Sequence, residues 1–304
     1  MFLKFCVPLI MMLFSLIGVA FLTLMERKIL GYLQIRKGPE KVGLAGVFQP
    51  FSDALKLLTK EFVVFLALNF YPYWLSPLIA LLLSVVVWLV FPYYYVILSW
   101  NLIILFMFSI MSLSVYPIMI SGWASNSSYA LLGSVRSVAQ SISYEVSFFF
   151  MIMSLSYLVG SLSLSDYMII QLNMWIIFYN LPLWLMFFVS FLAELNRTPF
   201  DFSEGESELV SGFNIEYGGF GFTFIFLAEY LSILFASLIL SFMFLGGNCY
   251  TLFYFFKLGG LSLLIILIRG TLPRYRYDKL MNMCWKSFLG VILFIIIWYS
   301  LILI

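Results

Sequence analysis

The stretch "PLIALLLSVVVWLVFPYYYVILSWNLIILFMFSIMSLSVYPIMI" (residues 77–120) contains no Asp, Glu, Lys or Arg. It belongs to a longer uncharged run that covers residues 62–135. A helix needs about 20 apolar residues to cross a bilayer, so this run is long enough for at least two membrane spans. Because lipid offers backbone groups no hydrogen-bond partners, spans are helices or closed barrels, and long apolar blocks favour helices.

The composition of the whole chain points the same way. Of its 304 residues, 64% are hydrophobic and 10% are charged, whereas soluble domains carry roughly 25% charged residues. We predict an all-α polytopic membrane protein that forms a single membrane domain over residues 1–304. About eight spans are expected, at roughly residues 3–25, 74–92, 101–121, 138–159, 168–192, 218–245, 251–269 and 286–304. The first span should be retained, because Glu26, Arg27 and Lys28 follow it without a small-residue cleavage site.

Basic residues are distributed unevenly between the two ends of these spans. When the polar segment after the first span (26–72) is placed on the side of synthesis, every second connection joins it there. Of the 16 basic residues, only Lys4 and Lys257 fall outside that side, which leaves 14 on it. This asymmetry follows the positive-inside rule and predicts that both termini face the opposite side.

The polar segment at 26–72 contains a pattern typical of an amphipathic helix. Apolar residues recur there at spacings of three and four, at Phe48, Phe51, Leu55, Leu58 and Phe62, and the other face carries Gln49, Asp53, Lys56 and Lys60. Such a helix lies flat in the membrane interface, where it would flank an opening from the lipid. The alternative is a short surface helix that covers a loop.

Several kinds of chemistry are excluded by the residues that the chain lacks. It contains no histidine and three scattered cysteines, Cys6, Cys249 and Cys284. Haem and zinc sites with histidine ligands, and nucleophiles activated by histidine, are therefore excluded within this chain. We predict that it holds neither a metal nor a redox centre of its own.

Two carboxyl groups lie inside otherwise apolar spans, at Glu145 and Glu229. An ionisable group costs roughly 2.5–3.5 kcal/mol near the centre of a bilayer, so it normally faces a protein interior or water. Serines share the helix face of Glu145, at positions 134, 137 and 141. We favour a proton or cation pathway; the alternative is a protonated carboxyl group that only holds two helices together.

A third group of carboxylates is concentrated in one connection. Residues 194–217 contain Glu194, Asp201, Glu204, Glu206, Glu208 and Glu216. The sequence places this acidic segment at the synthesis-side surface, between the fifth and sixth spans. Phe200, Phe202, Leu209, Val210 and Phe213 interleave with the charges, which favours a packed segment at the mouth of a proton path over a solvated acidic loop.

Four longer motifs resemble one known family. They are "ERKILGYLQIRKGPEKVG" (26–43), "SGWASNSSYALLGSVRSVAQSISYE" (121–145), "AELNRTPFDFSEGESELVSGFNIEY" (193–217) and "PRYRYDKLM" (273–281). The chain is similar, nearly end to end, to the subunit 1 family of mitochondrial NADH:ubiquinone oxidoreductase, respiratory complex I. It departs from the family pattern at Glu40, at Lys279 and in "YGGFGF" (217–222).

The resemblance implies a multi-pass subunit of the mitochondrial inner membrane, with its main loops, including the acidic segment, on the matrix side. The first, sixth and seventh spans and the interfacial helix would frame a chamber for ubiquinone, the substrate. The residues implied around the chamber are Arg27, Arg36, Asp53, Arg197, Tyr230, Arg269 and Arg274. The implied proton pathway comprises Glu145, Glu194, Asp201, Glu204, Glu206, Glu208, Glu216 and Glu229.

The same resemblance implies a division of labour with partners. FMN and iron–sulfur clusters would belong to other complex I subunits, which include quinone-site hydrophilic subunits and membrane-arm subunits. Lipids would be further partners, and nucleic acid would not. Two alternatives remain open: a secondary transporter that binds a coupling cation at Glu145 and Glu229, although no internal repeat is evident, and a scaffold whose catalysis would survive neutralisation of Glu145 or Glu206.

Overall fold

The computed structural model describes residues 2–61, 67–92, 101–203, 205, 212–214 and 216–303. Within these ranges every regular element is a helix. Their bounds are α1 Phe2–Leu33, η1 Leu44–Gly46, α2 Gln49–Leu58, α3 Phe70–Val86, η2 Val87–Val90, α4 Ile103–Leu113, α5 Val115–Ala124, α6 Ser128–Val159, α7 Leu164–Ile170, α8 Ile176–Tyr179, α9 Leu181–Glu194, η3 Gly212–Asn214, α10 Gly219–Phe244, α11 Leu252–Thr271, α12 Tyr277–Asn282, the π-helical turn η4 Met283–Phe288 and α13 Leu289–Leu303.

Seven helices in the described ranges are long and apolar enough to cross a membrane. They are Cys6–Leu33, Phe70–Val90, Ile103–Ala124, Ser128–Val159, Gly219–Phe244, Leu252–Thr271 and Tyr277–Leu301. The prediction of an all-α polytopic membrane protein is therefore confirmed. At about 1.5 Å per residue, the 32 residues of α6 and the 26 of α10 extend roughly 48 and 39 Å. Both exceed the hydrocarbon thickness of about 30 Å, so each is long enough to cross the hydrocarbon core with some tilt.

The fifth expected span, 168–192, is not one continuous helix. It is divided between α7, α8 and the 14-residue α9. Gln171, which ends α7, turns its side-chain amide toward the end of α10, where Nε2 donates to the carbonyl oxygens of Phe242 and Met243. A second break precedes α9, where Pro182 occupies the first turn and cannot donate a backbone hydrogen bond to α8.

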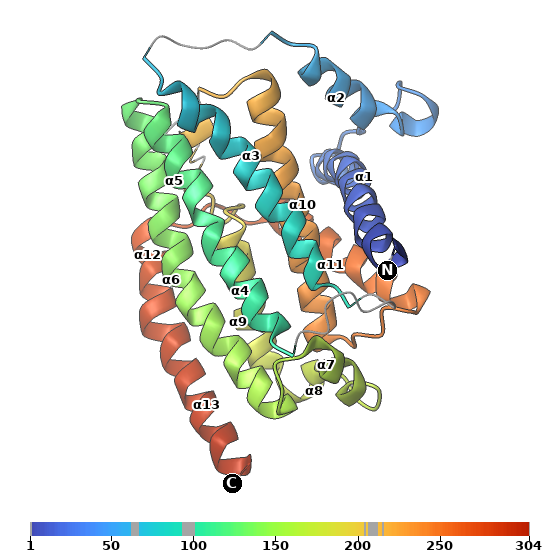
Figure 1. Ribbon diagram of the computed structural model, residues 1–304, viewed down its shortest axis with the longest axis vertical. Helices are drawn as coiled ribbons and strands as arrows, with labels where there is room; N and C mark the ends of the chain where they lie inside the picture. The colour runs from blue at the N-terminus through green and yellow to red at the C-terminus, as the bar shows by residue number, and fades with distance from the viewer. Residues whose placement is uncertain are drawn as a thin grey trace.

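Helix α10 forms the centre of the bundle and packs against α1, α3, α9 and α11 (Figure 1). Its sequence is apolar on nearly every face, which is the pattern of a helix enclosed by others. The last turns, including Leu238, Leu240 and Phe244, are fully buried. This central position places Glu229, in the first half of α10, among residues from several other helices.

Of two charged regions singled out in the sequence, one lies elsewhere than predicted and the other is packed as predicted. Helix α1 continues to Leu33, so Glu26, Arg27 and Lys28 belong to its last turns instead of following it. The acidic segment is expected to be packed, and its residues Arg197, Phe200, Asp201 and Ser203 are buried. They pack inside because the Gln140 amide of α6 donates to the carbonyl oxygens of Ala193 at 2.6 Å and Phe200 at 3.0 Å.

The expected amphipathic helix is present as α2, where it packs beside α1 and the start of α10 (Figure 1). Its apolar side chains Phe51, Leu55 and Leu58 remain exposed, while Phe62 lies outside the described residues. Exposed apolar side chains on one face are what a helix in a membrane interface presents to lipid. Its flat orientation in the membrane stays a prediction.

Candidate functional site

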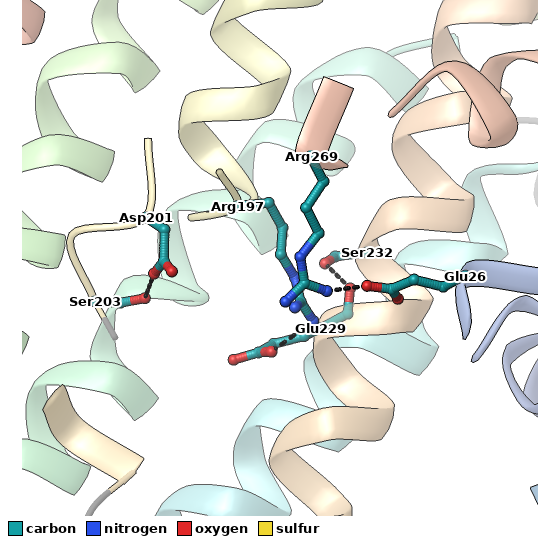
Figure 2. A network of polar contacts seen from close by, with 7 residues as sticks. All are labelled: Glu26, Arg197, Asp201, Ser203, Glu229, Ser232 and Arg269. Atoms are coloured by element: carbon teal, nitrogen blue, oxygen red, sulfur yellow. Dashed lines mark hydrogen bonds and ion pairs between the residues drawn. The ribbon is translucent and has the colours of Figure 1, made fainter. Parts of the chain in front are cut away.

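A cluster of charged side chains lies where the acidic segment meets α1, α10 and α11 (Figure 2); Glu26 and Arg197 are buried, and Glu229 and Arg269 are partly exposed. Arg197 from the acidic segment donates through Nη2 to Oε2 of Glu229 on α10 at 2.9 Å. The Arg197 guanidinium also lies over the Tyr230 ring, 4.9 Å from its centroid. A bonded guanidinium and carboxylate largely offset one another's desolvation, which explains how both charges are tolerated in the interior.

A second ion pair joins the same cluster from the other side. Arg269, at the end of α11, pairs with Glu26, which is 5% exposed in α1. Tyr230 lies near enough to Glu26 and Arg269 to interact with them electrostatically, so it adjoins both ion pairs. Sequence reasoning missed Glu26 because the residue stands at the boundary of an apolar run. Its "ERK" context reads as the end of a helix.

The segment after α11 fastens the acidic segment in place. Arg274 Nη2 approaches Oδ2 of the buried Asp201 at 4.0 Å, and Ser203 donates to Oδ1 of the same carboxylate at 3.5 Å. The Tyr275 amide donates to the Pro199 carbonyl oxygen at 2.9 Å. The structure therefore brings together four of the residues expected around a chamber, namely Arg197, Tyr230, Arg269 and Arg274, with the carboxylates Asp201 and Glu229.

The other three expected chamber residues form a separate, more exposed group. Arg27 pairs with Asp53 of α2 at 2.5 Å, and the two side chains are 50% and 30% exposed. Arg27 and Arg36 line a groove of about 430 Å³ together with Lys37, Leu30, Gly38 and Pro39. Arg27 belongs to this exposed group, and the preceding residue of α1, Glu26, belongs to the cluster around Arg197. The two groups therefore adjoin one another along one helix.

A cavity of about 160 Å³ lies beside the cluster around Arg197, between α3, α4, α5, α9 and α10. Glu194 and Glu229 both line it. Its other polar lining residues are Ser76, Ser84, Ser114, Ser121, Asn196, Ser203 and Ser232. A water needs about 10–15 Å³ of such space and two to four polar partners, so the cavity has room for several waters.

The remaining expected proton-pathway residues are placed only in part. Glu145 on α6 lies near enough to Glu194 for the two carboxyl groups to interact electrostatically. The backbone carbonyl of Glu216 accepts a hydrogen bond from the Tyr73 hydroxyl at 2.6 Å. Glu204, Glu206 and Glu208 lie outside the described residues. The structure thus brings Glu145, Glu194 and Glu229 to one region. The positions of Glu204, Glu206 and Glu208 stay predictions.

Comparison with known proteins shows to which family the chain belongs. The family model described as NADH dehydrogenase matches residues 7–300. The chain is 54% identical to NADH-ubiquinone oxidoreductase chain 1 of Aedes aegypti over 281 residues, which are 92% of this chain and 90% of that protein. The proteins of the same name from Locusta migratoria and Apis mellifera ligustica are 56% and 51% identical over 92% and 94% of this chain, and the matches cover 90% and 93% of those proteins.

The chain belongs to the subunit 1 family of respiratory complex I. The resemblance inferred from the four sequence motifs is thereby confirmed. Membership of the complex I family also agrees with the multi-pass helical fold.

One departure from the family pattern, Glu40, lies at an exposed position. Glu40 forms an exposed ion pair with Lys37, at 3.8 Å. Solvent-exposed pairs of this kind contribute about 0–1 kcal/mol, so we expect this substitution to have little effect on stability. Among the described residues, no group of three or more Cys, Asp or Glu is arranged to hold a metal ion.

Proposed function

We propose that this chain forms much of the ubiquinone chamber, and the first part of the proton pathway, of a proton-translocating NADH:ubiquinone oxidoreductase. The observation that carries the proposal is the Arg197–Glu229 pair at 2.9 Å. Arg197 belongs to the cations expected around the chamber, and Glu229 belongs to the expected proton pathway and lines the cavity. One ion pair thus connects the residues expected around the chamber with the residues expected along the proton pathway.

The proposed chamber is framed by α1, α2, α10 and α11. The exposed apolar face of α2 and the groove beside Arg27 and Arg36 are suited to admit a long apolar tail from the lipid. Electrons would come from FMN and iron–sulfur clusters in partner subunits. The other complex I subunits, both hydrophilic and membrane-embedded, and lipids are the partners that this assignment requires.

Charge pairing offers a physical route from quinone chemistry to proton movement. Reduction of ubiquinone to ubiquinol takes up two electrons and two protons, and its anionic intermediates attract cations. An opposite charge within about 4–6 Å favours the ionised form of a carboxyl group. If Arg197 shifts toward the quinone, Glu229 binds a proton more readily. The cavity that it shares with Glu194 then offers a path for that proton toward Glu145.

The location follows from the same assignment. We place the chain in the mitochondrial inner membrane, with the basic connections and the acidic segment on the matrix side. The uneven distribution of the basic residues supports this orientation, because positive charge is retained on the side of synthesis.

Replacement of Glu194 tests the proposal in assembled complex I. Glu194→Gln preserves the size of the side chain but removes an ionisable group from the cavity wall. We expect fewer protons moved per electron in reconstituted vesicles, together with slower ubiquinone reduction, while NADH oxidation by an artificial acceptor at the flavin persists. The exposed Glu40→Gln serves as the control. An unchanged proton ratio and an unchanged rate in Glu194→Gln would contradict the assignment.

A further inference from the structure

Two tyrosines stack where the acidic segment ends. Tyr217, which follows Glu216, lies parallel to Tyr73 of α3, with ring centroids 4.3 Å apart and an angle of 7° between the ring planes. Both side chains are buried. Stacked aromatic pairs contribute beyond the area that they bury, so this contact holds the end of the acidic segment against α3.

The hydroxyl groups of the same pair bind across the contact. Tyr217 Oη lies 2.9 Å from Ser76 Oγ and donates to the Tyr73 carbonyl oxygen at 3.2 Å. Tyr73 in turn donates to the Glu216 carbonyl oxygen at 2.6 Å. Burial raises the pKa of Tyr217, so the hydroxyl remains a neutral donor at physiological pH. Each tyrosine therefore binds a backbone carbonyl on the other segment.

A neighbouring glycine leaves the space that this arrangement needs. A Cβ atom at Gly221 would lie 2.9 Å from Cδ1 of Tyr217. Gly221 belongs to the run "YGGFGF" (217–222), whose departure from the family pattern has no place in the proposed chamber or pathway. Its glycine gives the Tyr217 ring room at the start of α10.

The contact also borders the cavity. Ser76, which hydrogen-bonds with Tyr217, lines it, and so does Phe213, four residues before Tyr217. Loosening the tyrosine pair would therefore release part of the cavity wall together with the backbone of Glu216. This places the pair at the boundary between the acidic segment and the space that Glu194 and Glu229 share.

We propose that Tyr73 and Tyr217 are positioning residues, a latch that fixes the end of the acidic segment on α3 and keeps Glu216 and the cavity wall in register for proton movement. This inference rests on the proposed function above. Neither tyrosine needs to exchange a proton, because the stacking and the hydrogen bonds do the positioning.

Conservative variants of the assembled complex separate the latch from general packing. Tyr217→Phe and Tyr73→Phe keep the rings but remove the cross-segment hydrogen bonds. The matched control is Tyr71→Phe, in the same helix and 84% exposed. We expect both latch variants, and not the control, to lower the number of protons moved per electron in vesicles. NADH oxidation by an artificial acceptor should stay unchanged.

Amide exchange supplies a readout that does not depend on activity. The Tyr217 amide is protected by its hydrogen bond to the Asn214 carbonyl oxygen, at 3.2 Å. Tyr217→Phe removes both hydrogen bonds of the Tyr217 hydroxyl, so it should raise the exchange of this amide with deuterium by more than the factor of about five expected for one buried hydrogen bond. Ser76→Ala, which removes a single partner of Tyr217, should produce a smaller change in the same direction. It also keeps the proposal testable if a tyrosine variant fails to assemble.

The outcomes distinguish the latch from the function on which it rests. The latch would be overturned if the tyrosine variants left the exchange of the Tyr217 amide unchanged. It would also be overturned if exchange became faster while the number of protons moved per electron stayed the same. A loss of ubiquinone reduction at an unchanged proton ratio would overturn it as well. If Glu194→Gln also leaves the proton ratio intact, the proposed function fails as well. If Glu194→Gln lowers the ratio and both tyrosine variants do not, only the latch is wrong.

Discussion

The two halves of α10 are surrounded by polar groups of different kinds. Around its first half, Arg197, Glu229 and Glu26 form ion pairs beside a cavity. Beyond its last turn, the Gln171 amide makes three hydrogen bonds, to Phe242 O, Met243 O and the Gly246 amide. The first group borders the cavity that we propose as part of the proton pathway. The second saturates backbone groups that the end of a helix leaves without partners.

Lys257 belongs to the second kind of site. Its Nζ atom donates to the Leu245 carbonyl oxygen at 2.5 Å and lies 4.1 Å from the centroid of the Trp175 ring. A cation at the carboxyl end of a helix is stabilised by the helix dipole. Comparison of the two halves teaches that burial of a polar residue does not by itself mark function.

The largest expected effect comes from breaking the central ion pair. Arg197→Met leaves the Glu229 charge without its guanidinium, which costs about 3–5 kcal/mol in buried pairs. We expect little assembled complex and almost no ubiquinone reduction, measured by native electrophoresis and by turnover. The double variant Arg197→Met/Glu229→Gln should recover assembly without turnover. A single variant with normal assembly and normal turnover would remove the distinction between the two halves.

A smaller effect is expected at the other end of α10. Gln171→Leu removes three hydrogen bonds and should destabilise the fold by about 1–3 kcal/mol, seen as a lower thermal dissociation temperature of the complex. The proton ratio should remain normal. Asn173→Leu, at an exposed position two residues away, is the control. A reduced proton ratio in Gln171→Leu would show that this half also takes part in coupling.

The smallest effect is expected at Lys257. Lys257→Met keeps the length of the side chain but removes the interaction between the ammonium group and the Trp175 ring. Such interactions contribute about 0.5–2 kcal/mol. We expect a slight fall in thermal stability and unchanged turnover and proton ratio, with the exposed Lys56→Met as the matched control. A strong loss of turnover would mean that Lys257 has a role beyond holding the end of α10.

Apolar runs in the sequence were sufficient to predict the membrane class and most of the helices. Of the two breaks in the fifth span, Pro182 marks one in the sequence, whereas the break at Gln171 was not predictable because its amide is drawn toward backbone groups 71–75 residues away. Glu26 was missed for a related reason. A charge that ends an apolar run looks like a boundary unless its partner is known, and that partner is Arg269 on α11.

The carboxylates of the candidate site were easier to recognise than their pairing. Glu229 stands out because it interrupts an apolar helix, and Arg197 because it is the only basic residue in the acidic segment. That the two bond to one another depends on how the segment folds back beside α10. The hydrogen bonds from Gln140 to Ala193 and Phe200 are among the contacts that fix this path, and no local pattern encodes them.

The Glu26–Arg269 pair also has a consequence for biogenesis. The two residues lie 243 positions apart in the chain. At about 5–20 residues per second, a ribosome needs on the order of tens of seconds to synthesise the intervening chain. During that interval the nascent α1 carries a carboxyl group whose final partner does not yet exist. Helix α1 therefore cannot complete this ion pair until α11 has emerged, and slower translation of the intervening region would lengthen that interval.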